Sequence, residues 1–191
     1  MERLKVFDES YTYVKEASRD EVHRQGLWHE TFHCWLVDDE FVYIQKRSAV
    51  KKDFPNLFDI TAAGHILATE TIADGIREVE EELGLVVELS QISPKGVVRD
   101  VIELPGFLDC EFANVFLYES SFAPNAFSLQ QEEVASVHGV NRQALIALFL
   151  KEVPTVECTN IFDDTTLEIG LVDFVPHERT YFEQIALLLK Q

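Results

Sequence analysis

The sequence lacks the long apolar run that a membrane-spanning helix requires. No stretch of about 18 residues is both uncharged and apolar. The start of the chain, MERLKVFDES, carries charges where a secretory signal peptide needs an apolar block. We therefore expect a soluble protein that is not secreted.

Cysteine is also scarce. The three cysteines, Cys34, Cys110 and Cys158, are odd in number, lie in apolar surroundings and lack the paired spacing of a metal site. Reduced thiols in the core are expected rather than a disulfide framework, and this predicts a cytoplasmic location.

Positive charge is the third shortage. The chain has 16 lysines and arginines against 34 aspartates and glutamates, which gives a net charge of -18. Binding to nucleic acid or to an anionic membrane needs clustered cations, so neither partner is expected and a small molecule is favoured. The bases are unevenly spread: Lys46, Arg47, Lys51 and Lys52 lie close together and form the one segment that would attract an anion.

The length and the composition favour one domain. With 191 residues and 47% hydrophobic side chains, the chain can form one substantial core, and no repeat or long Pro/Gly linker divides it. We expect a single domain over 1–191, with a short strand and helix as an N-terminal extension over about 1–28 and a C-terminal helix over about 177–190.

Apolar patterning predicts interspersed strands and helices. Strands are expected at 4–9, 32–39, 40–47, 57–64, 85–92, 93–104 and 110–121. Helices are expected at 18–25, where Ser18 is the cap, and at 71–83, 141–152 and 177–191. The segments 119–140 and 153–177 carry no readable pattern. This order favours an α/β fold with a mixed sheet covered on both faces.

The helix predicted at 71–83 has an acidic end, REVEEELG at 77–84. Spacing of three and four residues places Glu78, Glu81 and Glu82 on one face, while Glu80 points elsewhere. The C-terminal end of a helix disfavours negative charge, so a cation is expected there. Dense oxygen ligands suit Mg²⁺ or Mn²⁺. The alternative is a solvated acidic face, which is the commoner meaning of an isolated acidic run.

The wider stretch GHILATETIADGIREVEEELGL resembles the signature of the Nudix hydrolase family. Nine positions match in type: Gly64, Glu70, Arg77, Glu78, Val79, Glu81, Glu82, Gly84 and Leu85. The stretch departs from the signature in two ways. Six residues rather than seven separate Glu70 from Arg77, and Thr69 stands where a glycine is common. Both changes affect the loop before the helix and leave the register of the helix unchanged.

The resemblance implies a Nudix-type α/β/α sandwich in which a loop-helix-loop holds Mg²⁺ or Mn²⁺ against a diphosphate. Glu78, Glu82 and the backbone carbonyl of Ala63 would bind the metal. Glu81 would be a further ligand or the base that activates water, and Arg77 would orient a glutamate by an ion pair.

A broader and weaker resemblance connects HETFHCWLV, QKRSAVKKDFPNLFDITAAGH and DCEFANVF to type I isopentenyl-diphosphate isomerase, a relative with the same fold. That enzyme holds its metal with three histidines and two glutamates. Ala63 stands where it has a cysteine that takes part in proton transfer, which argues against isomerase activity. The resemblance implies a second metal or polar site, and structural roles in loops or along the sheet are the alternative for each histidine; the residues are His23, His29, His65, Asp109 and Glu111.

Two further groups of residues are candidates for contact with substrate. Arg47, Lys51 and Lys52 resemble the diphosphate-binding bases of the isomerase, with a solvated basic turn as the alternative. In many Nudix members a later loop supplies another glutamate as base or ligand. Glu132 and Glu133 are the candidates here, and a helix start or an exposed turn is their alternative.

We therefore expect a metal-dependent hydrolase, a pyrophosphohydrolase acting on a small diphosphate-linked molecule such as a nucleoside diphosphate derivative. Water would attack phosphorus. The alternatives are an isopentenyl-diphosphate isomerase-like enzyme and a non-catalytic nucleotide-sensing domain, which the retention of all three signature glutamates disfavours. Dimers are frequent in the family, so the resemblance also allows a homodimer.

Overall fold

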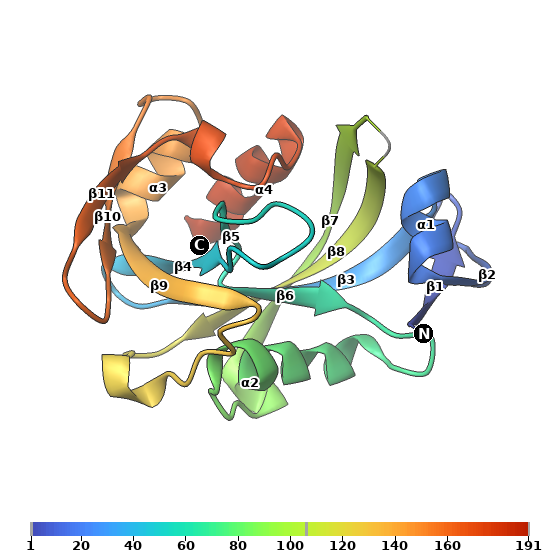
Figure 1. Cartoon of the computed structure of the whole chain (residues 1–191), viewed down its shortest axis with the longest axis horizontal. Helices are drawn as coiled ribbons and strands as arrows, with labels where there is room; N and C mark the ends of the chain where they lie inside the picture. Colours follow the sequence, from blue (N-terminus) through green and yellow to red (C-terminus); the bar gives the residue numbers. More distant parts are fainter. Residues whose placement is uncertain (1, 106, 191) are drawn as a thin grey trace.

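The computed structural model describes residues 2–105 and 107–190, so Met1, Gly106 and Gln191 of the expected domain lie outside the described residues (Figure 1). Its strands are β1 (Arg3–Phe7), β2 (Tyr13–Ser18), β3 (Trp28–Val37), β4 (Phe41–Arg47), β5 (Phe58–Asp59), β6 (Ala62–His65), β7 (Ile92–Leu104), β8 (Phe107–Glu119), β9 (Val134–Asn141), β10 (Val156–Asn160) and β11 (Thr166–Ile169). Its helices are α1 (Arg19–Gln25), α2 (Arg77–Leu83), α3 (Arg142–Phe149) and α4 (Arg179–Leu189), with 3₁₀ turns at Ile72–Ile76, Leu89–Gln91, Pro124–Ala126 and Leu171–Asp173.

One mixed sheet contains all of the described strands. Its path runs β11-β10-β9-β4-β3-β1-β2. The central strand β3 also pairs in parallel with β8, from Trp28–Cys110 to Val37–Glu119, and antiparallel with the short β6. Because β6 leads into the acidic helix, this pairing fixes the start of that segment against the middle of the sheet.

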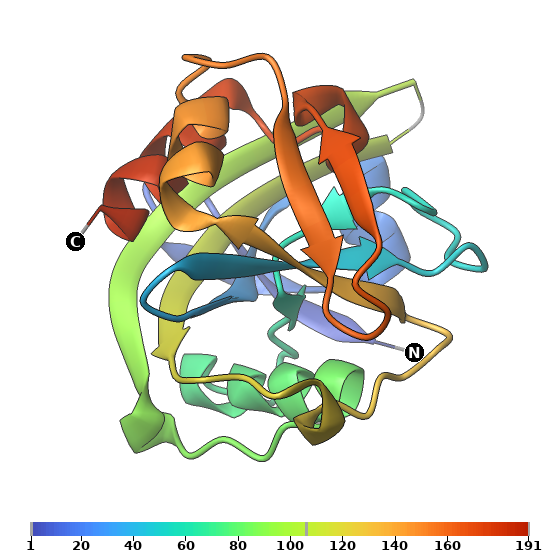
Figure 2. The same cartoon turned by 90° about the vertical axis from the view of Figure 1, so that its left-hand side faces the viewer.

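Helices cover both faces of this sheet. Along β3, Trp35 and Val37 belong to the core on the side of α3 and α4, whereas Phe32, Cys34 and Leu36 belong to the core that contains the buried side of α2. Figures 1 and 2 show α3 and α4 over one face and α2 over the other. A strand buried on both faces reads as an apolar run, as the last four residues of β3, CWLV, do. The expected α/β sandwich is confirmed.

The first helix forms as its sequence predicts. The hydroxyl of Ser18 accepts a hydrogen bond from the backbone N–H of Glu21 at 3.3 Å, and α1 ends at Gly26. The cap therefore sets the direction in which α1 leaves β2, and α1 carries His23 on its buried side.

Two expected strands differ in the structure. The segment 57–64 divides into β5, which pairs with β4, and β6, which pairs with β3. The hydroxyl of Thr61 bonds to backbone groups of Leu36 and Tyr43, so the chain crosses from one strand to the other at this point. The strand expected at 85–92 is wrong: Val86 is 75% exposed, and the side chain of Gln91 accepts from the N–H of Glu88 and closes a local turn instead.

Four strands lie where the sequence has no readable pattern or predicts only a connection, namely β2, β9, β10 and β11. Strand β9 lies inside the sheet between β4 and β10. Its sequence VASVHGVN interrupts apolar alternation with His138 and Gly139, and its burial depends on β4, which is far away along the chain.

The structure bears on two expectations, the one for the cysteines and the one for membrane-spanning segments. Cys34, Cys110 and Cys158 are free and buried, as predicted. Among the described residues, none of the helices has both the length and the apolar character that crossing a membrane takes.

Candidate active site

Helix α2 brings two carboxylates against strand β6. Glu82 is only 4% exposed, and its Oε2 accepts hydrogen bonds from the side-chain amide of Gln45 at 3.1 Å and from the N–H of Ala63 at 3.2 Å. One turn earlier, Glu78 lies against Gly64, where a β-carbon would overlap its carboxylate. Glycine at position 64 therefore permits the close approach of strand and helix.

The guanidinium of Arg77 connects the loop before α2 to the helix. Its Nε donates to Glu70 at 2.8 Å, and its Nη2 donates to the carbonyl of His65 at 3.1 Å. Its Nη1 donates to Glu78 at 2.6 Å and to Glu81 at 3.0 Å. The ion pair between residues 70 and 77 thus forms in spite of the shorter spacer.

Negative charge is in excess at this end of the pocket. Burial is the main cause that raises the pKa of Glu78 to about 7, against the opposing effect of Arg77. Burial, and then the nearby Glu78, raise the pKa of Glu82 to about 8. A buried and a partly buried carboxylate, whose charged forms burial disfavours, fit a hard divalent cation such as Mg²⁺ or Mn²⁺. Glu81, with 54% of its side chain exposed, completes the acidic face on the solvent side.

A basic loop, residues 48–56, faces this helix. Lys51 forms an ion pair with Glu133. The N–H of Ser48 donates to the carbonyl of Glu133 at 2.9 Å, and the N–H of Gln130 donates to the carbonyl of Glu82 at 3.0 Å. The segment 130–133 therefore lies between the basic loop and the end of α2, and it brings the two candidate glutamates of the later loop to the site.

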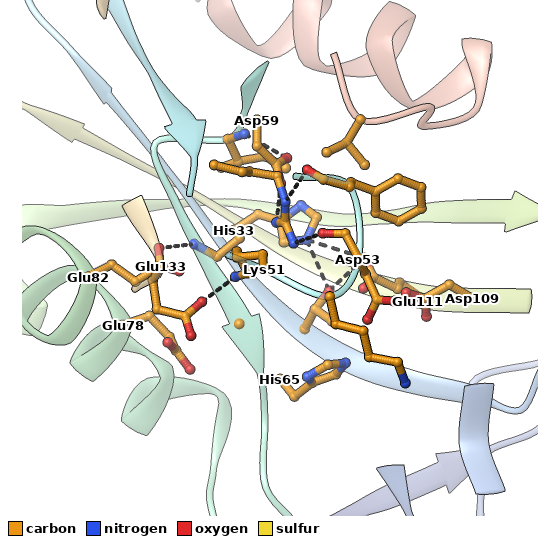
Figure 3. Close-up of a pocket in the computed structure, with 18 of the residues that line it drawn as sticks. His33, Lys51, Asp53, Asp59, His65, Glu78, Glu82, Asp109, Glu111 and Glu133 are labelled. Atoms are coloured by element: carbon orange, nitrogen blue, oxygen red, sulfur yellow. Dashed lines mark hydrogen bonds and ion pairs between the residues drawn. The ribbon is translucent and has the colours of Figure 1, made fainter. Parts of the chain in front are cut away.

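These residues line one pocket of about 670 Å³. In Figure 3, Glu78, Glu82 and Glu133 lie on the left, Asp109 and Glu111 lie on the right, and Lys51 lies between them. The pocket brings together most of the residues that the sequence predicted: Arg47, Lys51, Lys52, Ala63, His65, Arg77, Glu78, Glu81, Glu82, Asp109, Glu111, Glu132 and Glu133. Two predicted residues, His23 and His29, lie behind this lining and are buried.

A second group of ligand-type atoms lies at the other end. The Nε2 atoms of His23 and His29 each lie 3.5 Å from Oδ1 of Asp109, and none of these three buried atoms has a hydrogen-bond partner among the described residues. The ligand atoms of His23, His29 and His65 lie within 4.8 Å of one another, as do those of His29, Asp109 and Glu111. Unpaired buried nitrogen and oxygen atoms that converge in this way fit a metal ion.

The protonation states agree with that fit. Burial lowers the pKa of His23 to about 4 and lowers those of His29 and His65 as well, so all three imidazoles are neutral, the form that binds metals. Burial raises the pKa of Asp109. Burial also opposes ionisation of Glu111, but the hydrogen bond from His33 and the electrostatic effect of the nearby histidines together outweigh it and lower the pKa of this carboxyl.

Several polar residues of the pocket wall were missed by the sequence reasoning. Nδ1 of His177 lies 2.6 Å from Asp100, and its Nε2 lies 3.1 Å from Asp59. On the same side, Nδ1 of His33 lies 2.7 Å from the hydroxyl of Tyr181. The one available signal was Asp59, a charge within the apolar strand LFDIT, which indicates a buried partner. The sequence could not show which residue is that partner, because 118 positions separate residues 59 and 177.

Arg47 lines the pocket, but its guanidinium is already bonded within the chain. Nη1 donates to Asp59 at 2.8 Å, Nε donates to the carbonyl of Phe54 at 3.1 Å, and Nη2 donates to the carbonyl of Asp53 at 3.0 Å. Its contact with a substrate phosphate stays a prediction, whereas Lys51 and Lys52 bring ammonium groups on the loop itself.

Comparisons of the sequence and of the structure with known proteins find similar proteins. Residues 27–154 match the family model of the NUDIX domain. The chain is 31% identical over 193 residues to an uncharacterized Nudix hydrolase of Clostridium acetobutylicum, an alignment that covers 95% of this chain and 94% of the relative. It is 29% identical over 119 residues to an isopentenyl-diphosphate Delta-isomerase of Mycolicibacterium vanbaalenii, covering 60% of this chain and 65% of the isomerase.

The fold is similar to a crystal structure of a protein from Deinococcus radiodurans. The TM-score is 0.60 at 22% sequence identity, and the match covers 78% of this chain and 90% of the other. Both expected resemblances, to the hydrolase family and to the isomerase, are therefore confirmed.

Proposed function

The chain belongs to the Nudix hydrolase family, and from this we propose that it is a metal-dependent pyrophosphohydrolase acting on a small diphosphate-linked molecule, such as a nucleoside diphosphate derivative. Membership of the family makes the chain an enzyme of the hydrolase class. The observation that supports the proposal most directly is the pair of carboxylates, the partly buried Glu78 and the buried Glu82, held against β6 at the acidic end of the pocket.

In this proposal Glu78, Glu82 and the backbone carbonyl of Ala63 hold Mg²⁺ or Mn²⁺. The ion, when bound, would neutralise phosphate charge and lower the pKa of a water molecule. Arg77 fixes the orientation of Glu78 and Glu81, because one guanidinium nitrogen donates to both carboxylates. Glu81 is the ligand or base that is accessible to solvent, so it can accept a proton without first being uncovered.

The basic loop would bind the diphosphate. Lys51 and Lys52 are cations on the wall that faces the acidic helix, and phosphate oxygens would be held between their ammonium groups and the metal. Glu133 now pairs with Lys51. A phosphate that competes for this lysine would release Glu133, which makes Glu133 the stronger candidate for a further base and Glu132 the weaker one.

The cluster of His23, His29, His65, Asp109 and Glu111 is the observation that favours a second candidate, an isopentenyl-diphosphate isomerase-like activity. We propose that the cluster holds a second cation. Ala63 cannot transfer a proton, so hydrolysis remains the preferred reaction. An isomerase would exchange solvent hydrogen into its substrate and release no phosphate, and product masses separate the two reactions. The acidic net charge supports free small molecules rather than nucleic acid as partners.

A screen of diphosphate-linked compounds with Mg²⁺ and with Mn²⁺ tests the proposal, with phosphate release and product masses as readouts. We expect Glu82→Gln and Glu78→Gln to lower turnover more than about a hundredfold, beyond the loss typical of removing an outer-shell partner of a metal ligand. Glu80→Gln is the matched control, since Glu80 is exposed on the same helix and does not line the pocket. Turnover by Glu82→Gln at the parental rate would rule the proposal out.

A further inference from the structure

We propose that His177 is a positioning residue for diphosphate binding: through Asp59 and Arg47 it holds the basic loop 48–56, which carries Lys51 and Lys52. This inference rests on the proposed function of that loop. His177 lies outside residues 27–154, the part of the chain that matches the family model, so the inference assigns a role in the site to the C-terminal segment.

His177 is held between two buried carboxylates. Its Nδ1 lies 2.6 Å from Oδ2 of Asp100, and its Nε2 lies 3.1 Å from Oδ1 of Asp59. The side chain is 6% exposed, and Asp100 is fully buried. A neutral imidazole has one N–H and can donate to only one of the two carboxylates. Hydrogen bonds to both therefore require the imidazolium, whose charge offsets that of the two aspartates.

The chain fixes His177 from both sides. The N–H of Val175 donates to the carbonyl of Phe58 at 2.9 Å, beside Asp59, so the segment before α4 runs along β5. On the other side, the N–H of Glu178 donates to Oδ1 of Asp100 at 2.9 Å. The ring of Tyr181 stacks on the imidazole with centroids 4.7 Å apart. These contacts hold the imidazolium in one position.

From this point the contacts lead to the basic loop. Oδ1 of Asp59 faces His177, and Oδ2 of the same carboxylate accepts from Nη1 of Arg47 at 2.8 Å. The remaining nitrogens of that guanidinium donate to the carbonyls of Asp53 and Phe54. One carboxylate therefore connects the imidazolium to the guanidinium, and the guanidinium holds the loop by its backbone.

The carboxylates at the metal end of the pocket have hydrogen-bond partners of their own. Glu82 is supported by Gln45 and by the N–H of Ala63, and Glu78 is supported by Arg77. Loss of the imidazolium should free the Asp59 carboxylate to rotate and loosen the basic loop, without moving the acidic face of α2. The proposal therefore separates anion binding from metal binding.

The test measures binding, with methylenediphosphonate as a non-hydrolysable diphosphate probe in the presence of Mg²⁺ and with Mn²⁺ alone. We expect His177→Gln to raise the Kd for the diphosphonate about tenfold and to leave the Kd for Mn²⁺ within twofold. His138→Gln is the control, because it replaces another buried histidine by the same residue away from the pocket. It should change neither constant.

A double-mutant cycle tests the connection through the guanidinium. Arg47→Lys keeps the positive charge but loses the several nitrogen donors of the guanidinium. The double variant with His177→Gln should bind the diphosphonate no more weakly than the weaker-binding of the two single variants. If the double variant raises the Kd by the product of the two single increases, His177 does not act through Arg47. Asp59→Asn serves if His177→Gln fails to fold. The same tenfold loss is expected there, and unchanged binding would overturn the proposal.

The outcomes also separate this inference from the proposed function. If the parental protein does not bind the diphosphonate, both proposals are wrong. If the parental protein binds it and His177→Gln binds it equally well, only the role of His177 is wrong. A parallel loss of diphosphonate and Mn²⁺ binding would likewise overturn the positioning role, since it would indicate general damage to the fold.

Discussion

At one end of the pocket Glu78 and Glu82 come from successive turns of one helix, whereas at the other end five ligand-type residues come from α1, β3, β6 and β8. The first end has only oxygen donors, and burial raises the pKa of both carboxyls. The second end combines neutral imidazole nitrogens with carboxylates. Oxygen-only sites suit Mg²⁺ and Mn²⁺, while imidazole nitrogen also suits transition metals, so the two ends should select different ions.

The largest effect that would sharpen this comparison is the loss of a cobalt spectrum. Co²⁺ bound by imidazole nitrogens should give visible absorption bands, and His29→Gln should abolish them because it removes a fully buried ligand atom. Glu82→Gln should retain the bands, since its ligand oxygen lies at the other end. His138→Gln serves as the control for replacing a buried histidine. Equal bands in His29→Gln and the parental protein would contradict the assignment of the imidazole cluster.

A smaller effect concerns the wall between the two ends. Burial lowers the pKa of an imidazole, but the hydrogen bonds of His177 to Asp100 and Asp59 outweigh burial and raise its pKa to about 10. A histidine whose pKa is higher in the folded than in the unfolded state stabilises the folded state. This contribution is fully present below the unfolded pKa, about 6.5, and is lost as the pH rises through the folded pKa. The free energy of unfolding should therefore fall on the order of 3 kcal/mol between pH 7 and pH 10.

Urea denaturation at the two pH values measures this loss. Other groups titrate in the same range, so the comparison is with His177→Gln, which should lose less stability than the parental protein over the same interval. An identical pH dependence in the two proteins would show that His177 is not the charged link between its two aspartates.

The smallest expected effect tests how closely the acidic end is fitted to the sheet. Gly64→Ala places a β-carbon on the carboxylate of Glu78, which must move away from β6. We expect turnover to fall about tenfold, the lower end of the loss found when the support of a metal ligand is disturbed. Thr69→Gly, in the segment that follows β6, is the control. Parental turnover in Gly64→Ala would show that this close approach is not needed.

The acidic end was predictable because its geometry is local. Glu78, Glu81 and Glu82 share a helix face by spacing alone, and Gly84 ends the helix in the left-handed conformation, with φ at 72°. The cap at Ser18 was predictable for the same reason, since the donor and the acceptor lie three residues apart. Such features depend on helix geometry and hardly on the rest of the fold.

The other elements depended on distant partners. Strand β9 is buried because β4 and β10 flank it, although its own pattern is irregular. The segment 85–92 reads as a strand, yet only its last residue, Ile92, pairs with a described strand, and Val86 stays exposed. Asp59 lies within a predicted strand, and its partners, His177 and Arg47, follow only from the fold.

By itself, the sequence determined the helical register that gathers three glutamates, the reduced state expected of three buried cysteines, and the class of reaction that the signature implies. The resemblance to the isomerase implied a common site for His23, His29, His65, Asp109 and Glu111, but no spacing along the chain did, and the fold brings them together. Tertiary structure alone decided that the C-terminal segment joins the wall of the pocket. The physical reason is the range of the interactions. Helix geometry fixes neighbours three or four residues apart, whereas burial and the pairing of charges act between residues that only the folded sheet brings together.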